Sequence, residues 1–155
     1  MGEVWAALEG TPAAEWVRNA RWGYAAVNGA HVLGVALLVG AMVPLNLRRL
    51  GLFESVPQAA LARATVPVAG IGLALALVTG FLMFSSRASE YASLTLFQVK
   101  VALVVFGALG AVALHLAYGW FMQRANRTRL AIHGAVSMAV WVSALGLGRL
   151  IAFAD

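Results

Sequence analysis

Four segments of this chain are long, apolar and almost free of charged side chains. They cover residues 22–47, 66–86, 96–121 and 130–153, and each reaches the length of about 20 residues with which an α-helix crosses a bilayer. Backbone N–H and C=O groups find no water in hydrocarbon, so only α-helices and closed β-barrels are stable there. Long runs rich in Gly, Ala, Leu and Val are typical of helices and not of barrel strands. The sequence therefore predicts an all-α integral membrane four-helix bundle.

The first 21 residues differ from these spans because they carry several charges. Thr11-Pro12 is a typical helix start, with Thr as the N-cap and Pro at the first helical position. Apolar residues then recur every three or four positions, so we predict a short amphipathic interfacial helix over Pro12–Arg21. The chain is then a single transmembrane domain over residues 1–155, in which residues 1–21 form the interfacial segment.

Composition narrows the possible chemistry. The absence of cysteine excludes thiolate metal sites, iron–sulfur clusters and covalently attached haem. The net charge of +5 comes from scattered arginines without a basic, aromatic-rich stripe, which favours contact with the lipid bilayer and argues against a nucleic-acid partner. No catalytic motif of soluble enzymes is present, so the sequence leaves open whether the chain is an enzyme.

Basic residues in short loops indicate the orientation of the bundle. The loops after the first and third spans carry six arginines: Arg48, Arg49, Arg63, Arg124, Arg127 and Arg129. The opposite side carries five basic residues, of which Lys100 and Arg149 lie partly within spans. The positive-inside rule therefore predicts the arginine loops in the cytoplasm and both termini outside.

Ionisable side chains inside the spans are candidate functional residues, because a charge in hydrocarbon is costly. His31 lies about eight residues into the first span, roughly 12 Å from its outer side. Lys100 lies about four residues into the third span, and Arg149 about four residues before the end of the fourth. Asn28, one turn before His31, completes this outer group.

A second group lies toward the predicted cytoplasmic side. His115 is about six residues before the end of the third span, and His133 is about four residues into the fourth. Their depths differ by about 3 Å, since each residue of a helix rises 1.5 Å. Two histidines at matched depth on antiparallel neighbouring helices could ligate one haem iron.

These residues suggest a b-type haem, whose axial ligand is commonly a neutral imidazole in a helix bundle. His31, or the pair His115 and His133, could ligate iron, with Lys100 and Arg149 near the propionates. Alternatively, the histidines could only join neighbouring helices by hydrogen bonds, and the two cations could extend to the headgroups. Copper is less favoured, because Cu(I) prefers soft sulfur ligands and the chain has no cysteine.

The chain also resembles an uncharacterised family of small bacterial four-span membrane proteins. The resemblance runs from Thr11-Pro12 through His31-Val32-Leu33-Gly34 to Leu45–Gly51, and continues at Lys100, His115 and Gly148-Arg149. It implies a bacterial inner membrane location. In that family the position of Asn46 is usually Asp, so this chain lacks an acidic group near the inner end of the first span.

A more remote resemblance is to HemJ-type protoporphyrinogen oxidases and copper-resistance D membrane proteins. It is carried by His31 with Gly40 and a basic residue after the first span, and by Lys100 with the later His115. In HemJ-type proteins a histidine early in a span binds haem. The resemblance therefore implies His31 as the haem ligand and Lys100 as its functional companion.

Three functions follow as hypotheses from different classes. The first is an integral membrane protein that binds haem b, in electron transfer or as part of a membrane oxidoreductase. The second is a cofactor-free accessory subunit that packs against a larger membrane complex or forms a homo-oligomer. The third is a metal or small-solute permease.

Overall fold

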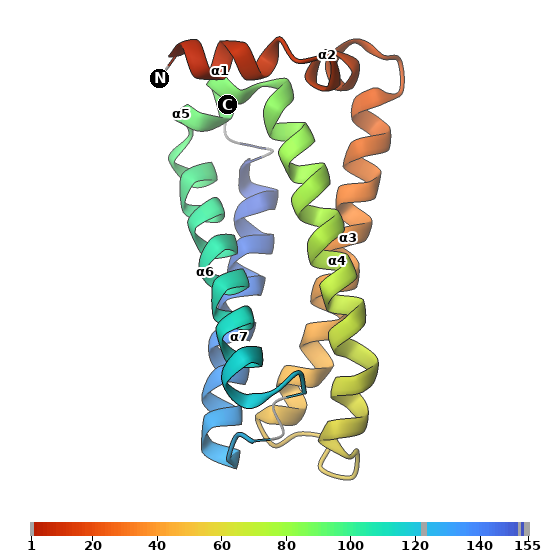
Figure 1. Ribbon diagram of the computed structural model, residues 1–155, viewed down its shortest axis with the longest axis vertical. Coiled ribbons are helices and arrows are strands. Elements are labelled where there is room, and N and C mark those ends of the chain that lie inside the picture. Colours follow the sequence, from red (N-terminus) through yellow and green to blue (C-terminus); the bar gives the residue numbers. More distant parts are fainter. Residues whose placement is uncertain (1, 122–123, 152, 154–155) are drawn as a thin grey trace.

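The computed structural model describes residues 2–121, 124–151 and 153, and every regular element in this part of the chain is a helix (Figure 1). Four long helices form the bundle: α3 (Gly23–Arg49), α4 (Gln58–Ser86), α6 (Thr95–Tyr118) and α7 (Arg127–Ile151). Three short helices accompany them: α1 (Gly2–Glu9), α2 (Pro12–Asn19) and α5 (Ala88–Ser93). The predicted all-α four-helix bundle is confirmed.

The helix ends lie within three residues of the predicted limits, apart from the start of α4. The sequence of residues 58–65 predicts a polar helical lead-in to the second span, and α4 accordingly begins at Gln58. α6 ends at Tyr118, before residue 121, because Gly119 has a φ of 84° that a helix cannot contain. Residues 1 and 152, which the predicted segments 1–21 and 130–153 include, lie outside the described residues.

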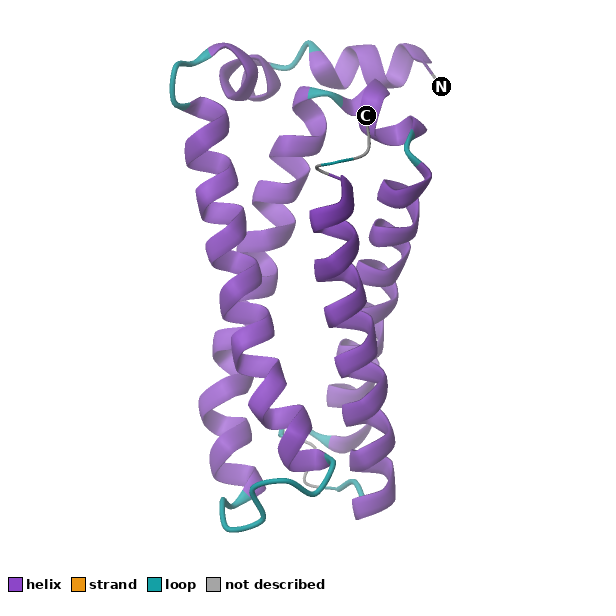
Figure 2. Ribbon diagram, turned by 180° about the vertical axis from the view of Figure 1, so that it is seen from behind, coloured by secondary structure: helices purple, strands orange, loops and turns teal. Residues whose placement is uncertain are grey.

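The four long helices associate as two pairs. α3 packs along α4, α6 packs along α7, and α3 joins the pairs through its contact with α7. α1, α2 and α5 lie across one end of the bundle, at the top of Figure 1, and Figure 2 shows the same arrangement from behind. We call this the terminal end. The opposite end holds the loop 50–57, the end of α6 and the start of α7, and we call it the arginine end.

The terminal end is built from capped short helices. Thr11 accepts a hydrogen bond from the Ala14 N–H at 3.4 Å, as its predicted N-cap role requires. Val17 of α2 is 1% exposed, and Arg18 donates to the Ser86 carbonyl at the end of α4 at 2.9 Å. α1, which the sequence did not predict, is tied to α5 because Glu9 accepts from the Ser89 N–H at 2.7 Å.

Two glycines bring α3 and α4 into backbone contact. A Cβ placed on Gly72 would lie 2.5 Å from the Leu38 nitrogen and 2.7 Å from the Gly34 oxygen. A Cβ on Gly34 would lie 2.7 Å from the Ala76 nitrogen. Small residues permit such close approach of helices in lipid, where dispersion and not water exclusion holds helices together.

Apolar side chains cover the outside of the bundle as well as its interior. The interior cluster comprises Leu38, Ala41, Ala69 and Trp141, with Gly107 of α6 packed against Trp141. In contrast, α6 has no buried residue, and its Leu116 is 80% exposed. An exposed apolar surface of this extent is unfavourable in water and suits lipid.

Candidate functional site

His31 is positioned by hydrogen bonds from α3 to α4. Its Nδ1 lies 3.0 Å from the Ala76 carbonyl oxygen and 3.1 Å from the Thr79 hydroxyl. The carbonyl can only accept, and the Thr79 hydroxyl already donates to the Leu75 carbonyl at 2.6 Å. Nδ1 must therefore carry the proton and donate to both oxygens. Nε2 is left with its lone pair, free to accept a proton or to bind a metal.

Glycines on two other helices make room beside His31 and Lys100. A Cβ on Gly80 of α4 would lie 3.1 Å from the His31 Cε1, so the imidazole lies directly on this helix. A Cβ on Gly148 of α7 would lie 3.2 Å from the Lys100 Nζ, so the ammonium of α6 lies against α7. His31 and Lys100 both lie in the part of their helix that is nearer to the terminal end. We call His31, Lys100 and the two glycines the His31 site, and its residues come from all four long helices.

The other two residues of the predicted outer group lie on the surface. Arg149 is exposed, and its guanidinium carbon lies 4.8 Å from the centroid of the Phe153 ring. Asn28 is also exposed. The structure therefore places His31 and Lys100 half-buried toward the terminal end, and Arg149 and Asn28 where lipid or headgroups would contact them.

His115 and His133 lie toward the arginine end, each against a different aromatic ring. The His115 ring is centred 5.8 Å from Trp120, and the His133 ring is centred 5.9 Å from Tyr118. The His115 Nδ1 is buried and has no hydrogen-bond partner within the part of the chain that the structure describes. In the same part, no three residues among His, Asp and Glu gather as a metal site.

A buried polar cluster between α3 and α7 was not predicted. Asn46, which is fully buried, donates from Nδ2 to the Ser137 hydroxyl at 3.0 Å. Its Oδ1 accepts from Nη1 of Arg49 at 3.2 Å, and Arg49 is only 8% exposed. Gly134 of α7 allows this contact, since a Cβ there would lie 3.0 Å from the Arg49 Cβ. We call Asn46, Arg49 and Ser137 the Asn46 cluster.

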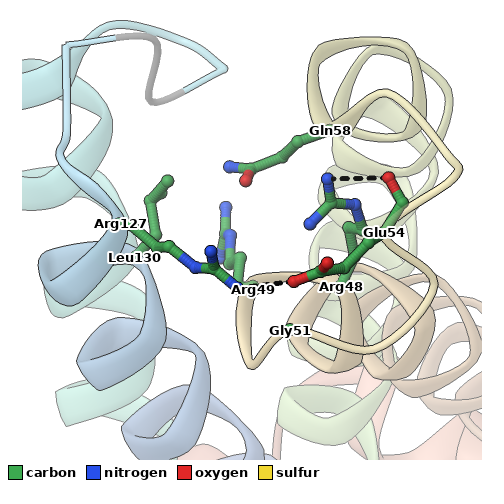
Figure 3. A pocket seen from close by; sticks show the side chains of 7 residues that line it. All are labelled: Arg48, Arg49, Gly51, Glu54, Gln58, Arg127 and Leu130. Carbon is green, nitrogen blue, oxygen red and sulfur yellow. Dashed lines mark hydrogen bonds and ion pairs between the residues drawn. The ribbon is translucent and has the colours of Figure 1, made fainter.

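Next to this cluster lies a cavity of about 340 Å³ (Figure 3). Its lining comes from the ends of α3, α4 and α7 and from the loop 50–57: Arg48, Arg49, Gly51, Glu54, Gln58, Arg127 and Leu130. Arg127 forms an ion pair with Glu54, and Arg48 donates to the carbonyl oxygens of Val56 and Glu54. We call this space the basic cavity.

The sequence partly indicated the Asn46 cluster and the basic cavity. Asn46 and Arg49 are three positions apart, so they share one face of a helix. The arginines of the basic cavity were already noted as markers of orientation, but their convergence depends on the loop between α3 and α4. Ser137 carried no signal of its own, because an isolated serine in an apolar helix commonly bonds its own backbone.

The fold defines a multi-pass membrane protein with four helices long and apolar enough to cross a bilayer. Comparisons with protein-family models, with curated proteins and with solved structures found no match to this chain. Its function must therefore be argued from the two ends of the bundle themselves.

Proposed function

We propose that this protein binds a b-type haem at the His31 site, with His31 as the axial ligand. The observation that carries the proposal is the hydrogen bonding of the imidazole. Histidines that bind a metal usually donate their other ring N–H to a carbonyl or carboxylate, which fixes the tautomer and the ring orientation. His31 meets this condition, because its Nδ1 is held by Ala76 and Thr79, and no residue that the structure describes forms a hydrogen bond with its Nε2.

The residues around His31 suit the other parts of a haem group. The Lys100 ammonium would pair with a propionate, and it extends from a different helix than the ligand. Gly80 and Gly148 have no side chains, so the imidazole packs directly on α4 and the ammonium directly on α7. A bound haem would supply one-electron chemistry, which suits a role in electron transfer or within a membrane oxidoreductase.

Visible absorption of the purified protein tests this proposal. We expect a Soret band after expression with added haem, and we expect its loss in His31→Gln. Glutamine still donates a hydrogen bond to the Ala76 carbonyl, so the fold should persist while the imidazole ligand is lost. His133→Gln is the matched control and should keep the band. A colourless native protein, or a band lost only in His133→Gln, would overturn the assignment to His31.

We further propose that the protein lies in the bacterial inner membrane with its arginine end in the cytoplasm, as the positive-inside rule requires. Because the chain has no cysteine, single cysteines can report each side. Ser93→Cys at the terminal end should react with an impermeant maleimide on intact cells. Ser55→Cys at the arginine end should react only after permeabilisation. The opposite labelling pattern would reverse the orientation.

A further inference from the structure

The basic cavity at the arginine end carries more positive charge than its own acidic group can neutralise. Three guanidinium groups face one carboxylate, that of Glu54. We propose that this cavity is a binding site for a phosphate group, carried by an anionic lipid or by a small soluble phosphate compound. The site lies at the opposite end of the bundle from His31, so the inference is independent of haem binding.

The ion pair in the cavity is easily exchanged. The side chains of Arg127 and Glu54 are 83% and 60% exposed, and an ion pair so exposed contributes little to stability. Arg48, by contrast, is held in place by the Val56 carbonyl at 2.7 Å and forms no ion pair within the described part of the chain. A phosphate would therefore contact Arg48, which is fixed in place, and Arg127, which can exchange Glu54 for the phosphate.

Arg49 supplies the strongest indication of a ligand. It is more than nine-tenths buried, and only its Nη1 has a described partner, the Asn46 amide oxygen. Its Nε is buried and without a hydrogen-bond partner among the described residues. Figure 3 shows its guanidinium in the cavity, between Arg127 and Gln58. A buried guanidinium with unsatisfied N–H groups is costly, and an anionic oxygen in the cavity would stabilise its charge with a charge-assisted bond.

The N-terminus of α4 also favours an anion in the basic cavity. Gln58 is both the first residue of this helix and part of the cavity lining. The helix has no side-chain cap at this end, and the Ala60 N–H already donates to the Pro57 carbonyl, so the N–H groups of Gln58 and Ala59 are left for a ligand. Helix N-termini favour anions, and phosphate is one of the anions that they bind.

Two arms of one experiment distinguish the sources of the phosphate, both with the full chain in nanodiscs. In the first arm, the discs are pure phosphatidylcholine and inorganic phosphate is titrated by calorimetry at constant ionic strength. In the second arm, no phosphate is added and phosphatidylglycerol replaces part of the phosphatidylcholine while the unfolding temperature is measured. Saturable heat in the first arm indicates a soluble phosphate compound. A saturable rise in unfolding temperature in the second arm indicates a lipid headgroup.

Variants then test whether the response comes from the basic cavity. Arg48→Gln and Arg127→Gln should each weaken binding about tenfold, the loss expected for one charge-assisted hydrogen bond. Glu54→Gln should strengthen it, because this change releases Arg127 and removes the competing carboxylate. Arg129→Gln is the matched control, since this arginine lies over the Tyr118 ring and does not line the cavity. No saturable response in either arm would overturn the proposal, and so would equal weakening by Arg129→Gln.

Discussion

Replacing Gly72 with alanine should destabilise the bundle by roughly 1–3 kcal/mol, the usual cost of adding a methyl group to a well-packed interior. The added Cβ would lie 2.5 Å from the Leu38 nitrogen and 2.7 Å from the Gly34 oxygen. Both atoms belong to the backbone of α3, so no side chain can rotate away. The two helices must separate along their whole contact, and the unfolding midpoint in detergent should fall accordingly.

The same substitution at Gly70 provides the control. Gly70 lies on the same helix two residues earlier, and a Cβ there would meet nothing within 4 Å. Alanine is the better helix former by up to about 1 kcal/mol, so Gly70→Ala should be neutral or stabilising. Equal effects of the two variants would show that α3 and α4 do not cross at Gly72.

Gly72→Ala should also affect the proposed haem site, because His31 is held between α3 and α4. His31 on α3 donates to Ala76 on α4, one turn beyond the crossing. If the helices separate, the Nδ1 hydrogen bonds are lost and the tautomer that leaves Nε2 free is no longer fixed. We therefore expect weaker haem retention in Gly72→Ala than in Gly70→Ala, which links the packing of the pair to its function.

The bilayer explains why the helices could be predicted from the sequence. Its thickness sets the length of each apolar run, and the helix is the structure that satisfies the backbone within one segment. The crossing at Gly34 and Gly72 could not be predicted in this way. Several glycines lie on each helix, and only the rotation of α3 against α4 selects this pair from the others.

The candidate site was predictable in part for a similar reason. Depth along the spans placed His31 and Lys100 at the same end, as the structure also does. The groups that contact them are a backbone carbonyl, two glycines and the Thr79 hydroxyl, and none of these is distinctive in the sequence of an apolar helix. The basic cavity escaped prediction because its arginines come from the end of α3 and the start of α7, which only the folded chain brings together.

The Asn46 cluster should be the other place where one substitution has a large effect. Asn46→Leu keeps a side chain branched at Cγ but removes the acceptor for Arg49 and the donor to Ser137. Arg49 would then keep its buried charge with no described partner, and the loss of a hydrogen bond to a charged group costs about 1.5–3 kcal/mol. The unfolding free energy measured in detergent should fall by that amount.

Asn46→Asp tests whether Asn46→Leu loses stability because Arg49 loses its hydrogen-bond acceptor or only because a buried residue is changed. Its carboxylate can accept from Arg49 and from the Ser137 hydroxyl, which donates as readily as it accepts. This variant should be at least as stable as the native chain, whereas Asn46→Leu is destabilised. Asn28→Leu is the matched control, because Asn28 lies exposed on the same helix and should tolerate leucine. If Asn46→Leu were as stable as Asn28→Leu, Arg49 would not depend on Asn46, and its charge would have to be neutralised from the basic cavity alone.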